Sequence, residues 1–241
     1  MNTPWKAHIL TLFPDMYPGP LGVSVVGQAL QSGIWSLDCT DIREFGTGKH
    51  KSVDDTPSGG GPGMVMRADV IGDAVDSALA QNSDVPLIYL SPRGKPFNQK
   101  KAHELASEKG VVLLCGRFEG VDQRVLDARN IEEVSIGDYV LSGGEIASMA
   151  LLDAVVRLLP GVLGAKDSIS EESFEQGLLE YPQYTRPRKW ENRNIPEMLQ
   201  SGNHARIAEW RREQAIELTK VRRPDLWERY LAEKVDKNEQ E

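Results

Sequence analysis

The stretch Val111–Glu145, VVLLCGRFEGVDQRVLDARNIEEVSIGDYVLSGGE, decides the fold of this 241-residue chain. Its pattern predicts a strand over Val111–Cys115, a helix over Val121–Ala128, a strand over Ile131–Ile136 and a long helix that begins at Gly144. The first strand is apolar throughout, which is typical of strands covered on both faces of a parallel sheet. Because strand and helix alternate, the stretch predicts an α/β layered fold.

The same alternation continues on both sides of this stretch. Further strands are predicted at Ala7–Phe13, Trp35–Ile42 and Pro86–Ser91, and further helices at Ser24–Ser32, Ala68–Ala80, Gln99–Lys109 and Gly144–Leu159. Pro160 ends the pattern, and the glycines and prolines that follow are typical of a linker. The sequence therefore predicts an α/β domain over 1–160, an interdomain linker over 161–195 and a small all-α domain over 196–241, with helices at Asn203–Arg222 and from Pro224.

Composition narrows the class of protein. The only cysteines, Cys39 and Cys115, lie far apart in the sequence, so neither a disulfide framework nor a cysteine-rich zinc site is expected. The four histidines show no metal-ligand spacing, and no metal site is predicted. The N-terminal residues lack the pattern of a signal peptide, and no apolar run is long enough to span a bilayer. These features predict a cytoplasmic protein.

The charge distribution points in two directions. A net charge of −8 argues against a nucleic-acid binder, because affinity for phosphates comes from Lys and Arg. Residues 186–223, however, hold ten basic and five acidic residues, a local net charge of +5. Such a run is either a solvated helical face or a local anion-binding surface, and its composition leaves both interpretations open.

Glycine-rich loops follow the predicted strands. CGRFEG (115–120) comes directly after one strand, SIGDYVL (135–141) after the next, and SGGE (142–145) opens the long helix. Ligands of open α/β sheets bind beyond the carboxyl ends of the strands, so these loops and Tyr89–Ser91 predict one composite pocket. The alternative, that these are ordinary turn glycines, stays open. The loop SGGGPGMVM (58–66) matches neither a P-loop nor GxGxxG.

Two polar features outside these loops have competing explanations. Carboxylates of the linker, among them Asp167, Glu171 and Glu172, could serve as a general base or lie solvated on the surface. Arg157 lies on the last turn of an apolar helix. It either buries its aliphatic stem at the edge of the core and keeps its guanidinium in water, or it faces an anionic or carbonyl group.

Several motifs occur together in one order: SVDDTPSGGGPGMVM (52–66), IYLSPRG (88–94), LLCGRFEGVDQR (113–124), SIGDYVLSGGE (135–145), DAVVRLLPGVLG (153–164), ESFEQGLLEYPQYTRP (172–187), LQSGNHARIAEWR (199–211) and RRPDL (222–226). Together they closely resemble the bacterial tRNA (guanine-N1)-methyltransferases of the SPOUT superfamily, over nearly the whole chain. The resemblance implies methylation of the guanine immediately 3′ of the anticodon. It also implies a deep trefoil knot in the α/β domain and a homodimer whose active sites are built from both subunits.

The resemblance further implies S-adenosylmethionine as cofactor and a dependence of the activity on Mg²⁺. The cofactor residues carried over are Tyr89, Leu90, Ser91, Gly116, Glu119, Ile136, Gly137, Asp138, Tyr139, Val140, Leu141, Gly143 and Gly144. Those expected to face the tRNA are Asp54, Gly59, Gly60, Gly61, His204, Arg206, Arg211 and Arg212.

The same resemblance assigns the catalytic residues. Arg157 would stabilise charge on guanine O6, and the carboxylate before Ser-Phe would remove the N1 proton. The family usually has Asp there, whereas this chain has Glu172, so Glu172 is the expected base and Asp167 its rival. Another SPOUT RNA methyltransferase and a non-catalytic RNA-binding protein are the alternatives. The carboxylate-bearing linker argues against the first, and the intact glycine loops argue against the second.

Overall fold

A computed structural model of the chain describes residues 3–164 and 170–238. The chain divides into two compact units, Met1–Gly164 (unit 1) and Ala165–Glu241 (unit 2). Asp167, the rival carboxylate, lies outside the described residues.

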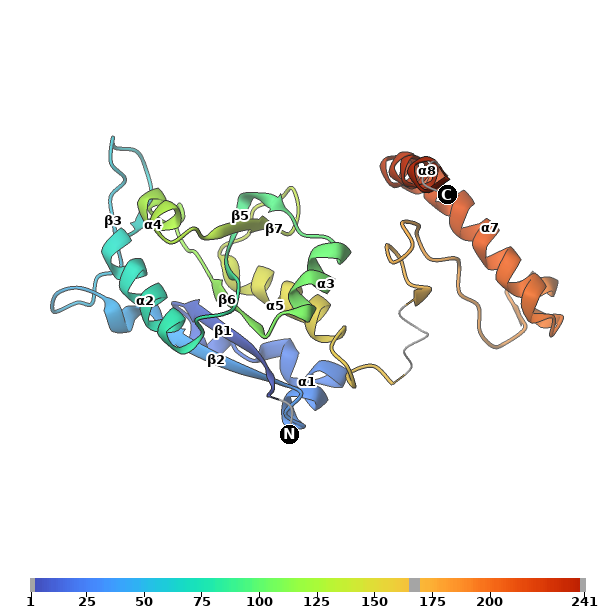
Figure 1. Ribbon diagram of the computed structural model, residues 1–241, viewed down its shortest axis with the longest axis horizontal. Helices are drawn as coiled ribbons and strands as arrows, with labels where there is room; N and C mark the ends of the chain where they lie inside the picture. Colours follow the sequence, from blue (N-terminus) through green and yellow to red (C-terminus); the bar gives the residue numbers. More distant parts are fainter. Residues whose placement is uncertain (1–2, 165–169, 239–241) are drawn as a thin grey trace. The chain divides into compact units, whose positions relative to one another are not determined.

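Unit 1 is built on a sheet of five parallel strands in the order β2-β1-β6-β5-β7 (Figure 1), which confirms the predicted parallel α/β fold. The strands are β1 (Trp5–Thr11), β2 (Trp35–Asp41), β5 (Leu87–Pro96), β6 (Gly110–Leu114) and β7 (Glu132–Ser135). The helices are α1 (Ser24–Gln31), α2 (Ala68–Gln81), α3 (Gln99–Ser107), α4 (Gln123–Ala128) and α5 (Gly144–Val156). Short 3-10 helices occur at η1 (Pro14–Met16), η2 (Gly19–Gly22) and η3 (Ile42–Phe45), and β3 (Asp54–Asp55) pairs antiparallel with β4 (Val65–Met66).

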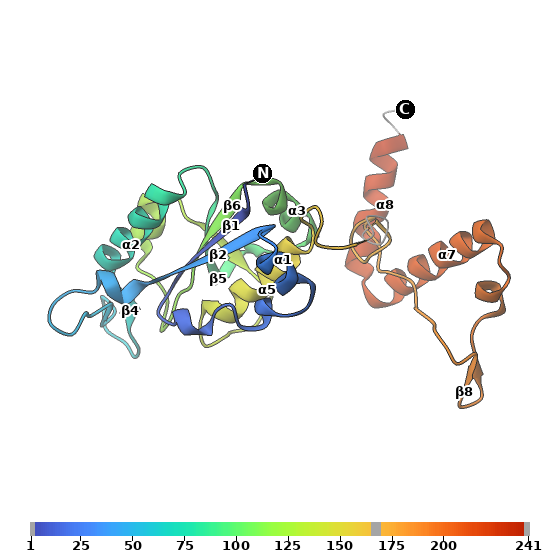
Figure 2. The same cartoon turned by 90° about the horizontal axis from the view of Figure 1, so that it is seen from below.

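The central strand β6 shows why the sheet is covered on both faces. Val111 and Leu113 pack into a core with α1, α3 and α5, whereas Val112 and Leu114 pack into a second core with α2 and α4. Side chains alternate along a strand, so an uninterrupted apolar run supplies both cores at once. Figure 2 shows the two helical layers on either side of the sheet.

The helix boundaries follow from capping. α4 begins at Gln123, two residues later than predicted, because the Asp122 side chain accepts a hydrogen bond from the Arg124 amide at 2.9 Å. α3 begins after Asn98, whose side chain accepts from the Lys101 amide at 2.9 Å. α5 ends at Val156, three residues before the predicted end, and a turn leads to Pro160.

β5 is longer than predicted and irregular at its carboxyl end. Leu90 pairs with Val134 of β7, residues 91–94 leave the ladder, and Lys95 then pairs with Val134 again. Such irregularities often occur beside functional sites because they redirect side chains. Here the detour carries Ser91, Pro92 and Arg93 beyond the end of the sheet, where they line a cavity.

Unit 2 contains the hairpin β8 (Lys189–Trp190) and β9 (Arg193–Asn194), the 3-10 helix η4 (Glu197–Gln200), and the helices α7 (His204–Arg222) and α8 (Pro224–Asn238). Residues 170–195, predicted as an interdomain linker, belong to this unit. The Leu179 amide donates to Thr219 Oγ1 of α7 at 2.9 Å, and the neighbouring Leu178 is buried. The linker segment is thereby held against α7.

Candidate functional site

A cavity of about 300 Å³ opens at the carboxyl ends of the adjacent strands β6, β5 and β7. We call it the strand-end cavity. Its walls come from the detour of β5, the loop that follows β6, the loop that follows β7 and the first turn of α5. The three strand ends thus form one pocket, as the glycine loops predict, and its volume lies at the lower end of the range for small-molecule sites.

Nearly all the residues expected to hold a cofactor line this cavity. They are Tyr89, Leu90, Ser91, Gly116, Glu119, Ile136, Gly137, Tyr139, Val140, Leu141, Gly143 and Gly144, whereas Asp138 does not line it. The residues from the loop after β7 form an apolar wall, and Tyr139 and Val140 in it are 53% and 84% exposed. Whether these residues bind a cofactor stays a prediction.

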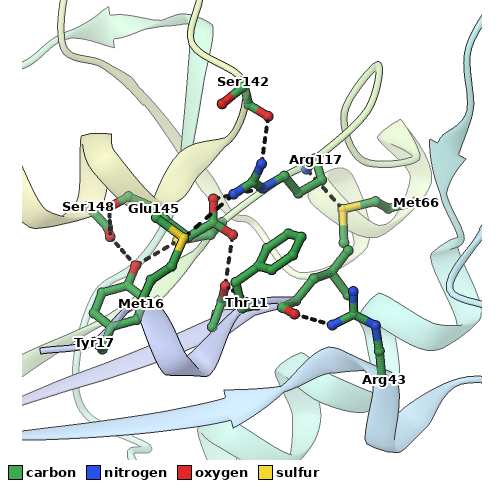
Figure 3. A network of polar contacts seen from close by, with 12 residues as sticks. Thr11, Met16, Tyr17, Arg43, Met66, Arg117, Ser142, Glu145 and Ser148 are labelled. Atoms are coloured by element: carbon green, nitrogen blue, oxygen red, sulfur yellow. Dashed lines mark hydrogen bonds and ion pairs between the residues drawn. The ribbon is translucent and has the colours of Figure 1, made fainter. Parts of the chain in front are cut away.

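An ion pair between the buried carboxylate of Glu145 and the half-buried Arg117 joins two of the loops that form the cavity (Figure 3). Arg117 of the CGRFEG loop places Nε 2.9 Å from Oε2 of Glu145 on the first turn of α5, in the geometry of an ion pair rather than of a hydrogen bond. Its Nη1 donates to the Ser142 carbonyl at 3.1 Å. Arg117 therefore ties the loop after β6 to the residues that open α5.

The surroundings of Glu145 compensate for its burial. The side chain is 1% exposed, and its Oε1 accepts a hydrogen bond from Thr11 Oγ1 at 2.8 Å. The Arg117 guanidinium also lies over the Phe13 ring, 4.3 Å from its centroid. A buried carboxylate is strongly destabilising without a charged partner, so the position of Arg117 is fixed by the fold itself.

Glycine is required where the two loops meet. The Gly144 amide donates to the Gly116 carbonyl at 3.0 Å. A Cβ on Gly144 would lie 2.8 Å from the Cα of Cys115, closer than real side chains approach a backbone. The close approach of α5 to the end of β6 therefore depends on the missing side chain.

A second group of polar contacts involves Tyr17, Ser148 of α5 and Cys115, the residue before Gly116 of the cavity wall (Figure 3). The Tyr17 hydroxyl contacts Ser148 Oγ and lies 3.5 Å from Cys115 Sγ. Burial raises the pKa of the Cys115 thiol to about 12, and burial likewise raises the pKa of Tyr17. Cys115 is therefore a protonated, buried thiol and not a nucleophile.

A larger cavity of about 1000 Å³ adjoins the first, since Arg93 and Glu119 line both. We call it the arginine cavity because Arg67, Arg93, Arg124 and Arg129 line it. Three of these arginines pair with aspartates: Arg67 with Asp69, Arg124 with Asp122 and Arg129 with Asp76, each at 2.7 Å. A ligand in this cavity would meet charged groups that are already neutralised.

The glycine-rich loop of residues 58–64 connects β3 to β4 and contacts Glu119. A Cβ on Gly63 would lie 2.5 Å from the Glu119 side chain, and the Glu119 amide donates to the Met64 carbonyl at 2.9 Å. Asp54 is half-buried in β3, whereas Gly59, Gly60 and Gly61 are exposed with φ values of 94°, 79° and 117°. The loop is thus anchored beside the boundary of the two cavities, and its tip is free of side-chain packing.

Two loops of the predicted site carry phenylalanines in the left-handed backbone region. Phe118 of the CGRFEG loop has a φ of 58° and is 54% exposed, and Phe174 has a φ of 77° and is 45% exposed. This conformation costs bulky residues free energy, on the order of 1–3 kcal/mol each, and such strain gathers at functional sites. The strain thus marks the loop after β6 and the segment that carries Glu172.

Glu172, the expected base, is half-buried and lines a cavity inside unit 2. We call it the linker cavity. The neighbouring Glu171 accepts from the Tyr181 hydroxyl at 2.7 Å and from Arg211 Nη1 at 3.3 Å, and Arg211 lies 4.7 Å from the centroid of the Tyr181 ring. Arg211, expected to contact tRNA, thus contacts the linker segment within this unit.

Arg157 is not brought to the strand-end cavity within one chain. It follows the last residue of α5, whereas the cavity lies at the first turn of that helix, so about 20 Å of helix separates the two ends. The other residues expected to contact tRNA lie on α7. His204 and Arg206 are exposed on its first turn, and Arg212 donates to the Tyr230 hydroxyl of α8 at 3.3 Å.

Within residues 3–164 and 170–238, no helix has the length and apolar character needed to cross a bilayer. No three side chains from His, Cys, Asp and Glu gather there as metal ligands would.

Sequence reasoning missed Arg117 and Glu145 as partners. Both lie in glycine-rich motifs, and a charged residue in such a loop is ordinarily read as exposed or as a ligand contact. The only available signal was that Glu145 opens a helix whose other positions are largely apolar.

The comparisons with known proteins agree with one another. The model of the family described as tRNA (Guanine-1)-methyltransferase TrmD matches residues 5–229. The chain is similar to a tRNA (guanine-N(1)-)-methyltransferase of Rhodopseudomonas palustris (strain BisB18), with 63% identity over 93% of this chain and 89% of the relative. It is also similar to the protein of the same name from Ruegeria pomeroyi, with 60% identity over 96% of both chains.

Proposed function

Because this chain belongs to the family of tRNA (guanine-N1)-methyltransferases, we propose that it transfers a methyl group from S-adenosylmethionine to N1 of the guanine immediately 3′ of the anticodon, position 37. The observation that carries this proposal is the pair of adjoining cavities. The strand-end cavity has the size and lining of a cofactor site, and the arginine cavity beside it has room for a nucleotide. Glu119 and Arg93 stand at the boundary, where a group would pass from one ligand to the other.

The residues of the strand-end cavity fit S-adenosylmethionine. Leu90, Ile136 and Leu141 offer apolar surface for an adenine ring, and the carboxylate of Glu119 matches the positive charge of the cofactor. When bound, this cofactor supplies a methyl carbon activated by a positively charged sulfur. The ion pair between Arg117 and Glu145 holds the loops of this site in place before any ligand arrives.

Guanine N1 carries a proton at neutral pH, so the enzyme must remove it as N1 gains the methyl group. We assign this role to Glu172, whose carboxylate accepts the N1 proton. The negative charge that then develops on O6 is stabilised by hydrogen bonds from the guanidinium of Arg157. Glu172 keeps the charge of the usual aspartate, and its extra methylene is accommodated more easily in an irregular segment than on a strand.

The position of Arg157 supports a homodimer with shared active sites. This arginine lies about 20 Å along α5 from the cavity of its own chain, so a second copy is the natural source of the arginine. Unit 1 also exposes apolar side chains near η2 and the start of α5: Val23 is 64% exposed, Val25 41% and Ile146 54%. An exposed apolar surface of this kind is typical of an interface between subunits.

Three further features are expected from the family. We propose that the loops after β6 and β7 form its trefoil knot, and the hydrogen bond between Gly144 and Gly116 supports their close association. Mg²⁺ would assist activity as in the family. The tRNA would contact the basic residues 186–223, including the exposed His204 and Arg206.

A primer-extension assay tests the site of modification, because N1-methylguanine blocks reverse transcriptase. We expect a stop at the guanine 3′ of the anticodon that depends on the enzyme and on S-adenosylmethionine. A tRNA with adenine at that position, and one without the preceding guanine, serve as substrate controls. A stop elsewhere, or methylation of a ribose, would contradict the proposal.

Single-turnover methylation tests the base. Glu172→Gln keeps the size of the side chain but cannot accept the proton, so we expect the rate to fall about 10²- to 10⁴-fold. Calorimetry should show unchanged affinity for S-adenosylmethionine. Asp167→Asn is the matched control and should stay active; an active Glu172→Gln beside an inactive Asp167→Asn would overturn the assignment.

A further inference from the structure

The hairpin formed by β8 and β9 exposes a large aromatic side chain. Trp190 is 58% exposed, although tryptophan is highly buried on average in folded proteins. All residues of the hairpin, 189–194, are exposed. In Figure 2 the hairpin extends away from the helices α7 and α8 of the same unit. Trp190 therefore belongs to a surface and not to the core of unit 2.

The backbone of the hairpin places an arginine beside this tryptophan. Trp190 pairs with Arg193 across the two strands, so both side chains lie on the same face. The two turn residues, Glu191 and Asn192, have φ values of 43° and 62°, as a tight two-residue hairpin requires. The Ile195 amide donates to the Arg188 carbonyl at 3.0 Å and closes the base of the hairpin.

The charge around Trp190 favours an anionic partner. Residues 186–194 hold four basic side chains and one acidic one, a net charge of +3 in a protein whose overall net charge is −8. The basic residues are Arg186, Arg188, Lys189 and Arg193, and all are exposed. A platform of one aromatic ring among several cations is the arrangement with which proteins bind single-stranded nucleic acids.

We propose that the hairpin binds the single-stranded anticodon loop of the tRNA, with a base stacked on the indole of Trp190 and a phosphate bound by Arg193. This inference rests on the proposed function, because it takes tRNA as the substrate. Stacking requires unpaired bases, whose faces are free in the loop and covered in the paired stem. The hairpin would therefore distinguish a single-stranded loop from double-stranded RNA. The positive charge of residues 186–223 attracts both and cannot distinguish them.

Binding of labelled RNA to the full-length protein tests the proposal. The probes are an anticodon stem–loop with guanine 3′ of the anticodon and a blunt duplex of the same length. We expect Trp190→Ala to weaken binding of the stem–loop about 5- to 150-fold and to leave binding of the duplex unchanged. Trp190→Phe, which keeps a stacking face, should restore most of the affinity.

Salt dependence separates the two side chains. Arg193→Gln should lower the slope of log affinity against log salt by about one, because one phosphate contact is lost. Trp190→Ala should leave that slope unchanged. The matched control is Val221→Ala on α7, an apolar side chain of the same unit that is 79% exposed, which should change neither quantity.

Three results would overturn the inference. The first is a Trp190→Ala variant that binds the stem–loop within twofold of the parent protein. The second is an equal loss of affinity for the duplex, which would indicate a general effect on unit 2. The third is a change in sedimentation of the variant, which would show that a second copy covers this face. If the parent protein methylates tRNA normally in these cases, the proposed function stands and only the role of the hairpin fails.

Discussion

In unit 1, Glu145 is 1% exposed and pairs with Arg117, whereas in unit 2 Glu171 is 51% exposed in its pair with Arg211. Both pairs lie beside a predicted site and join segments distant in sequence. A buried pair is costly to break, while an exposed one contributes about 0–1 kcal/mol. The difference indicates that the cavity in unit 1 is fixed by the fold, whereas the ion pair of Glu171 holds the segment with Glu172 only weakly.

The apolar core of unit 1 is also more extensive than that of unit 2. Unit 1 buries two clusters that cover both faces of its sheet. Among the described residues of unit 2, only Leu178, Ala215 and Thr219 are buried. A site built on a packed sheet keeps its geometry without ligand. A segment that packs against few buried side chains opens at a lower free-energy cost than the rest of the protein. If Glu172 is the general base, as we propose, its place on such a segment would suit an enzyme that completes its active site when the substrate binds.

The largest expected effect comes from removing the buried charge. Glu145→Gln keeps the size of the side chain but leaves Arg117 without its ionic partner, so we expect the free energy of unfolding to fall by about 3 kcal/mol. Urea denaturation measures this loss, and calorimetry should show weaker binding of S-adenosylmethionine, because the loops after β6 and β7 lose their link.

Glu171→Gln in unit 2 is the matched control, with an expected loss below about 1 kcal/mol. Equal losses for the two variants would break the comparison. So would a Glu145→Gln variant that binds S-adenosylmethionine as the parent protein does. Hydrogen exchange in α5 and β6 shows whether the destabilisation starts in unit 1.

A smaller effect is expected from filling the contact between α5 and β6. In Gly144→Ala the added Cβ would lie 2.8 Å from the Cα of Cys115, which is backbone and cannot rotate away. Overpacking of this kind costs about 1–3 kcal/mol, and S-adenosylmethionine should bind more weakly because Gly144 lines the cavity. Gly164→Ala is the control, since its Cβ would meet nothing within 4 Å. If both variants unfold at the same urea concentration, the packing argument is wrong.

The sequence predicted the sheet well because β6 and its neighbours bury both faces. A run such as VVLLC is apolar on both faces, so it predicts a strand that is covered on both sides. The bounds of β2 (Trp35–Asp41) and β6 (Gly110–Leu114) lie within one residue of the predicted bounds. The strand ends of the site could be predicted for the same reason. Residues 92–96 of β5 escaped prediction because Pro92, Gly94 and Lys95 resemble a loop. Only Lys95 and Pro96 of this stretch pair with β7, and sequence spacing does not reveal that contact.

The rest of the site depends on contacts between distant residues. Arg117 and Glu145 lie in different motifs, and neither motif indicates that its charged residue pairs with one in the other motif. The hairpin that carries Trp190 was missed because each strand has two residues, too few for a periodic pattern. Helix length alone predicts that Arg157 lies at the end of α5. That the cavity lies at the opposite end of this helix is known only from the structure.

The smallest expected effect concerns a neutral buried group of unit 1. His8 on β1 is 5% exposed. Its Nε2 lies 2.8 Å from Thr40 Oγ1, and its Nδ1 accepts a hydrogen bond from the side-chain nitrogen Nδ2 of Asn82 at 3.0 Å. Burial lowers the pKa of His8, and the nearby Asp38 opposes this shift only in part. The folded protein therefore takes up this proton at a lower pH than the unfolded chain, whose histidine titrates near its ordinary value of 6.5.

The sign of the effect follows from linkage. As the pH falls through about 6.5, the unfolded chain gains the proton first, so the free energy of unfolding decreases toward acid and is restored at neutral pH. We expect urea midpoints to drop between about pH 7.5 and about pH 5.5 in the parent protein and to drop less in His8→Gln. Hydrogen exchange should place the acid-induced loss in β1 and β2, because His8 lies on β1 and contacts Thr40 of the paired strand β2. Equal pH slopes for the parent and the variant would show that His8 does not carry the loss, and unit 1 would then differ from unit 2 in its ion pair and packing alone.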